Sequence, residues 1–127
     1  LLKVVKAMKR GTPFYYLPDQ DFGAKDAVFA PFFGFPAATV TGVSRLAQLT
    51  NARVIAIVSK MVSDGYESYY TEAWENFPGA SVEEDTARMN QFIESWVLQM
   101  PDQYFWLHKR FKTRPEGEPS VYGKHHR

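Results

Sequence analysis

The chain has 127 residues, of which 45% are hydrophobic, so it can bury the core of one small domain, and its 16% aromatic content suits apolar clefts and bilayer interfaces. A formal net charge of +1 is too small to indicate wholesale nucleic-acid binding. The absence of cysteine excludes thiol chemistry, disulfide bonds and zinc sites with cysteine ligands.

The first ten residues predict a helix. Leu1, Leu2, Val5 and Met8 recur at helical spacing, and Gly11 supplies a stop at the C-terminal end. The chain begins inside this pattern and without a methionine. We therefore expect a fragment of a longer protein, whose signal or anchor segments, if any, would lie upstream.

Two carboxylates follow the apolar run 14–17, which predicts a first buried strand. Ligands bind where strands end in an open α/β sheet. If the backbone stays extended, Asp19 and Asp21 point to one side and Gln20 to the other. Two acids facing one pocket could handle protons or hold a cationic partner. The alternative is a simple turn, because Pro, Asp and Gly are common turn residues.

Residues 27–44 carry no charge, but four Pro and Gly residues would break a membrane-spanning helix there. The segment instead predicts a strand, a turn and the start of a helix. Residues 27–33 form the strand, either buried or as a pocket wall. The helix is expected over 38–50, where apolar residues fall on one face, with Asn51 as its stop.

Residues 53–59 contain a continuous apolar run, which predicts a strand buried on both faces and, with the preceding helix, a parallel strand pair. Ser63, Asp64 and Gly65 predict a hairpin turn. Aromatic and polar residues alternate over 66–74, as in an antiparallel partner strand. The expected fold class is α/β, with a mixed, mainly parallel sheet flanked by helices.

A long helix is predicted after Ser81, which forms a capping box with Glu84. Pro101 ends this helix, and residues from 113 onward predict an irregular tail. The apolar stripe along the helix is expected to be core rather than a cofactor site. The stripe comprises Met89, Ile93, Trp96, Val97 and Met100.

A basic aromatic block occupies residues 104–114 and contains Lys109, Arg110, Lys112 and Arg114. Arg and Lys could bind phosphate or carboxylate groups, and the aromatic residues could lie at a lipid interface or stack on a single-stranded nucleic acid. The alternative is a solvated helix end whose aromatic residues are core.

The three histidines give weak signals. His108 has no acid five positions after it, and no nucleophile can be assigned to it, so a structural role is expected. His125 and His126 are adjacent, but without other ligands they do not define a metal site. We predict no metal and no cofactor.

Three stretches agree in order and spacing with one family. They are residues 14–23, residues 28–34 with 37–42, and residues 106–115. Taken together they resemble the lipid A biosynthesis lauroyl acyltransferase family, and the run 108–117 is close to its C-terminal signature. The similarity extends from residue 1 to about 122. It implies that residues 1–122 are the C-terminal part of one glycerol-3-phosphate acyltransferase-like domain, followed by a tail at 123–127.

The resemblance implies an enzyme at the cytoplasmic face of the inner membrane of a Gram-negative bacterium. Such an enzyme transfers a lauroyl- or myristoyl-type chain from acyl carrier protein to a lipid A precursor, without a nucleic-acid partner. The family's catalytic His, followed five positions later by an acid, and a helper Arg lie upstream of the matching segment. The fragment alone is therefore expected to be inactive. The His would act as general base on the acceptor hydroxyl.

The family's helper Asp falls on Asp19, which we expect to order the upstream base, the Arg or the acceptor. Gln20 and Asp21 are weaker candidates for substrate contacts, and Asp21 could simply fix the loop. The aromatic run 29–35 either lines the acyl slot or packs in the core. The remaining substrate-binding candidates, expected to face the acidic carrier protein or lipid phosphates, are Lys109, Arg110, Lys112 and Arg114.

Two other functions stay open. The same chemistry could acylate another lipid, because no residue in this chain identifies the acceptor. A different class of function is a non-enzymatic module that binds anionic lipid or single-stranded nucleic acid through residues 104–114. Salt-sensitive nucleic-acid affinity without acyl transfer in the full-length protein would favour that module.

Overall fold

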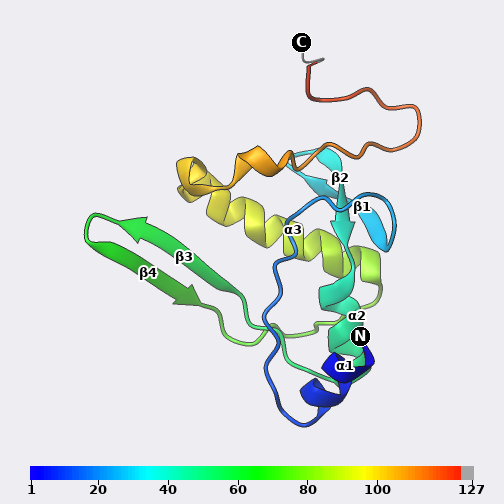
Figure 1. Cartoon of the computed structure of the whole chain (residues 1–127), viewed down its shortest axis with the longest axis vertical. Coiled ribbons are helices and arrows are strands. Elements are labelled where there is room, and N and C mark those ends of the chain that lie inside the picture. Colours follow the sequence, from blue (N-terminus) through cyan, green and yellow to red (C-terminus); the bar gives the residue numbers. More distant parts are fainter. Residues whose placement is uncertain (124–127) are drawn as a thin grey trace.

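A computed structural model describes residues 1–123, so His125, His126 and most of the tail 123–127 lie outside the described residues. Three α-helices and two antiparallel hairpins make up the described chain (Figure 1). In chain order the elements are α1 (Leu2–Lys9), β1 (Ala27–Phe32), β2 (Phe35–Val40), α2 (Gly42–Thr50), β3 (Ile57–Val62), β4 (Gly65–Tyr70), α3 (Val82–Gln99) and the short 3₁₀ turns η1 (Pro101–Gln103) and η2 (Trp106–His108).

The class α/β is correct, but the mainly parallel sheet is wrong, because both described sheets are two-stranded and antiparallel. Residues 35–40 return along β1, pairing Phe32 with Phe35 and Ala27 with Val40. Phe33 and Gly34 both have positive φ, as a two-residue hairpin turn requires. The helix expected from residue 38 therefore begins only at Gly42. It ends at Asn51 in the left-handed conformation, as predicted.

The second hairpin also differs from the strand predicted over residues 53–59. The strand expected over 53–59 begins at Ile57, and its residues alternate between exposed and half-buried rather than being buried on both faces. The predicted turn is confirmed, since Val62 pairs with Gly65 across Ser63 and Asp64. A ribbon of two strands projects beside α3 and can bury at most one face, which accounts for the alternation (Figure 1).

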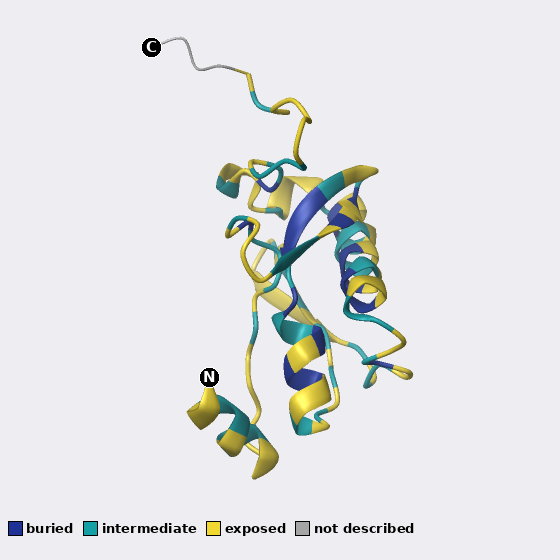
Figure 2. Cartoon of the chain, turned by 90° about the vertical axis from the view of Figure 1, so that its right-hand side faces the viewer, coloured by how far each residue is buried: buried dark blue, intermediate teal, exposed yellow. Residues whose placement is uncertain are grey.

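The core lies where α3 packs against β1 and β2, and buried segments of α2 extend it (Figure 2). The capping box is confirmed, because Ser81 Oγ accepts a hydrogen bond from the Glu84 amide at 3.1 Å. Met89 and Val97 of the predicted apolar stripe are 5% exposed. Asn90, fully buried beside them, donates through Nδ2 to Thr39 Oγ1 at 3.1 Å and so joins α3 to β2.

The uncharged segment 27–44 forms a strand, a turn, a second strand and a helix start, which confirms that it is not a continuous helix. Across residues 1–123, no helix combines the length and the apolar character needed to cross a membrane.

The first apolar run, residues 14–17, was wrongly predicted as a buried strand. It is irregular, and Phe14, Tyr15 and Leu17 are exposed, because no neighbouring strand pairs with this stretch.

Candidate functional site

The segment that carries Asp19 and Asp21 has neither helix nor strand, so side-chain contacts determine its position. Asp21 is 3% exposed, and its carboxylate accepts three hydrogen bonds. One comes from the Gly23 amide at 2.9 Å, and two come from the amide and hydroxyl of Thr113 at 2.7 and 2.8 Å. These contacts support the alternative in which Asp21 fixes the loop.

Asp19 is half-buried and is held through its main chain. Its carbonyl oxygen accepts hydrogen bonds from His108 Nε2 at 2.9 Å and from the Tyr104 hydroxyl at 3.4 Å. Burial, and after it the negative charge of Asp19, raises the pKa of Tyr104, so this hydroxyl stays protonated and can donate. Both of these hydrogen bonds use the main-chain carbonyl of Asp19, while its carboxylate lies close enough to the Tyr104 hydroxyl to raise the pKa of that group.

Arg110 is a buried cation, only 1% exposed, that interacts electrostatically with both acids of this loop. Its Nη1 donates to the Ala38 carbonyl at 2.8 Å, and its Nη2 donates to Thr39 Oγ1 at 2.6 Å. Burial lowers the pKa of Arg110, whereas the negative charges of Asp21 and Asp19 raise it. Both carboxylates therefore act on one buried guanidinium group.

The basic aromatic block separates into an inner and an outer set of cations. Arg114 belongs with Arg110 inside, because it donates to the Pro36 carbonyl at 2.7 Å and pairs with Glu118. Lys109 and Lys112 are exposed. Arg110 and Arg114 therefore bind backbone of β2 instead of facing outward, and the expectation that the cations face a partner stays a prediction for Lys109 and Lys112. The sequence carried a signal for this burial, because both inner positions are Arg, whose planar guanidinium group can bind two acceptors at once.

The sequence analysis did not predict the contacts that Tyr104 and Thr113 make with the loop carrying Asp19 and Asp21, called the Asp loop below. Both residues lie more than 80 positions from the loop, and no local pattern connects them to it. Gln20, the weaker candidate between the two acids, is half-buried. His108 has the structural role expected of it, since its ring nitrogens face the carbonyl oxygens of Asp19 and Phe105.

Residues 1–113 match the family model described as bacterial lipid A biosynthesis acyltransferase. The chain belongs to this family. It is 39% identical over 122 residues to the lipid A biosynthesis palmitoleoyltransferase of Escherichia coli K12, an alignment that covers 94% of this chain and 40% of that protein. The identity to the lipid A biosynthesis lauroyltransferase of the same strain is also 39%, with the same coverage.

A third relative is a lipid A biosynthesis acyltransferase of Haemophilus influenzae, 37% identical over 125 residues that cover 94% of this chain and 40% of the relative. The chain thus spans about 40% of the length of the lipid A acyltransferases that it matches.

The aromatic run 29–35 of this family member divides between core and surface. Ala30 and Phe32 are buried, and the Phe32 ring lies 5.8 Å from the ring of Phe111. Phe29 and Phe35 are 41% and 51% exposed. Core packing therefore accounts for the two inward side chains, while the two exposed rings are still available to line an acyl slot.

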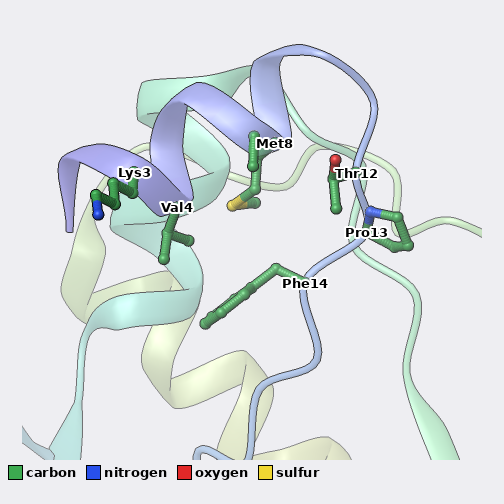
Figure 3. A pocket seen from close by; sticks show the side chains of 7 residues that line it. Lys3, Val4, Met8, Thr12, Pro13 and Phe14 are labelled. Atoms are coloured by element: carbon green, nitrogen blue, oxygen red, sulfur yellow. The ribbon is translucent and has the colours of Figure 1, made fainter.

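A separate apolar hollow of about 230 Å³ lies between α1 and residues 12–14 (Figure 3). The ring of Phe14 extends beneath α1 toward Val4 and Met8. The residues that line this hollow include neither carboxylate of the Asp loop, so it is distinct from the candidate site. Among residues 1–123 there is also no group of three or more His, Asp or Glu side chains that could hold a metal ion.

Proposed function

We propose that the full-length protein transfers a fatty acyl chain from acyl carrier protein to a hydroxyl group of a lipid A precursor, and that this chain forms its C-terminal part. The match of residues 1–113 to the lipid A acyltransferase family carries the proposal. The names of its relatives, which include lauroyl-, myristoyl- and palmitoleoyltransferases, support acyl transfer in lipid A biosynthesis.

In the proposed reaction, an upstream His removes the proton of the acceptor hydroxyl, whose oxygen attacks the thioester carbonyl. The new ester C–O bond forms, the C–S bond breaks, and the proton passes to the leaving thiolate of the donor. Asp19 orders the upstream base, the upstream Arg or the acceptor. The support for this role is that Asp19 is half-buried in a loop held in place by Tyr104 and His108. The other acid of the loop, Asp21, holds the loop in position through its hydrogen bonds with Thr113.

We further propose that the protein acts at the cytoplasmic face of the bacterial inner membrane. One face of the β3–β4 hairpin supports membrane association, because the register places Met61 beside Tyr66 and Ile57 beside Tyr70 on the same side. All four side chains are exposed, and Tyr66 is 74% exposed. Tyrosine is favoured at membrane–water interfaces, where one end of its side chain is apolar and the other is polar.

The exposed cations Lys109 and Lys112 are proposed to attract the acidic carrier protein or the lipid phosphates. We expect Lys109→Glu combined with Lys112→Glu to raise KM roughly fivefold at low salt with little change in kcat, because like charges now repel. Steady-state kinetics of the full-length enzyme at several salt concentrations measure the effect. Lys3→Glu with Lys6→Glu on α1 is the control with the same net charge. Equal KM values for the two double variants would contradict the proposal.

The overall function is tested with the purified full-length protein in detergent micelles. Lauroyl-, myristoyl- and palmitoleoyl-carrier protein are each offered with a lipid A precursor, and mass spectrometry detects the mass added to the acceptor. We expect one acyl group to be added, and none when the upstream His is replaced by Ala. Acylation of a different lipid instead would correct the acceptor. Salt-sensitive binding of a single-stranded oligonucleotide without transfer would favour the non-enzymatic module.

A further inference from the structure

The basic aromatic block contacts the Asp loop at both acidic residues. At Asp19 the contacts come from the side chains of His108 and Tyr104. At Asp21 they come from Thr113, through its amide and its hydroxyl. Since the loop has no strand partner, these contacts from the end of the chain substitute for a β-ladder.

We propose that Tyr104 and His108 are positioning residues, which place Asp19 for acyl transfer by holding its main-chain carbonyl oxygen. The proposal rests on the proposed function, because it assigns a purpose to the fixed position of Asp19. The basic aromatic block would then have two roles, because its exposed lysines attract a partner and Tyr104 and His108 position Asp19.

The direction of the hydrogen bonds follows from the chemistry of the groups. A carbonyl oxygen can only accept, so the contact with Asp19 at 2.9 Å is a hydrogen bond in the form of His108 that carries a proton on Nε2. The Tyr104 hydroxyl can donate in the same way and lies 3.5 Å from His108 Nε2. The two donors thus converge on one oxygen atom, which limits how far the Asp19 backbone can move.

Aromatic packing fixes the Tyr104 ring itself. It lies 6.1 Å from the ring of Phe32, which is fully buried, and 4.8 Å from the ring of Trp106 in an edge-on arrangement. Farther along the block, Arg110 binds β2 through the Ala38 carbonyl. Tyr104 and His108 form what we call the clamp on Asp19. The chain is attached to the β1–β2 hairpin before His108 by Tyr104 and after it by Arg110, so the clamp restricts the motion of the loop relative to the core.

The test is a double-mutant cycle in the full-length enzyme, with kcat and KM measured for His108→Ala, Asp19→Ala and the combined variant. We expect His108→Ala to lower kcat roughly tenfold at nearly constant KM, because a displaced helper group affects the chemical step. In the Asp19→Ala background the same change should have no further effect. His108→Gln retains a donor near the position of Nε2 and should recover most of the activity, whereas Tyr104→Phe should lower kcat by a smaller factor.

Hydrogen–deuterium exchange of residues 17–23 provides a readout that does not depend on catalysis. We expect faster exchange there in His108→Ala than in the wild type, and unchanged exchange in Leu107→Ala, the matched control. Leu107 is 82% exposed and adjoins His108. Unchanged exchange in His108→Ala would overturn the clamp, even if the protein proved to have no acyltransferase activity.

The kinetic outcomes separate the two proposals. If His108→Ala lowers kcat by the same factor with and without Asp19, or if His108→Gln does not recover activity, the positioning role is overturned while the proposed function stands. If the wild-type protein transfers no acyl chain, the proposed function fails, and the exchange measurement alone decides whether His108 holds the loop.

Discussion

Replacing Asp19 by asparagine in the full-length protein is expected to lower kcat about 100-fold with KM nearly unchanged, the magnitude typical of losing a group that assists proton transfer. The loop should stay in place, because His108 and Tyr104 bind the main-chain carbonyl of Asp19, which the substitution retains. Initial-rate kinetics with acyl-carrier protein as donor measure the effect.

Asp26→Asn is the matched control for this change. Asp26 is an exposed residue with positive φ at the turn before β1, a conformation that asparagine adopts readily. We expect its kinetic constants to equal those of the wild type. A kcat of Asp19→Asn within twofold of the control would show that the carboxylate takes no part in the reaction.

Arg110→Ala is expected to lower the free energy of unfolding by about 3 kcal/mol, because two buried acceptors lose the hydrogen bond from a charged donor, and Asn90 still donates to only one of them. These acceptors are the Ala38 carbonyl and Thr39 Oγ1, both enclosed in β2. The change also removes the buried positive charge that acts on Asp19 and Asp21. Chemical denaturation of the full-length protein, followed by fluorescence, measures the loss.

Two variants make this prediction specific. Lys112→Ala removes an exposed cation from the same block, and its free energy of unfolding should change by less than about 0.5 kcal/mol. Arg110→Lys keeps the charge but should recover little stability, because an ammonium group cannot reproduce the planar fork that binds two acceptors. Equal unfolding curves for Arg110→Ala and Lys112→Ala would refute the buried role of Arg110.

Signals confined to a few neighbouring residues predicted the structure well. Ser81 caps α3, Asn51 ends α2, and the turn at Ser63 and Asp64 reverses the second hairpin. Each depends on short-range hydrogen bonding or on a backbone conformation that only a few residue types adopt. The family resemblance similarly rested on contiguous motifs, and the match over residues 1–113 confirmed it.

Strand partners were predicted poorly, because continuous apolar character does not tell a parallel neighbour from a hairpin return. Val40 shares a helical face with Val43 and Leu46, which favoured a helix from residue 38, yet residues 35–40 pair with β1 because Phe33 and Gly34 form a tight turn. The free energy of that pairing and of packing against α3 outweighs the weak local helix preference.

The sequence by itself therefore determined the family, the cap of α3 at Ser81, the end of α2 at Asn51, the turn of the second hairpin and the candidacy of Asp19. Only the tertiary structure decided which charges of the block are buried and what holds the Asp loop. Arg110 and Lys112 are two positions apart, yet one binds β2 inside the protein and the other is exposed. That difference arises from contacts over more than 70 positions, which local periodicity does not encode.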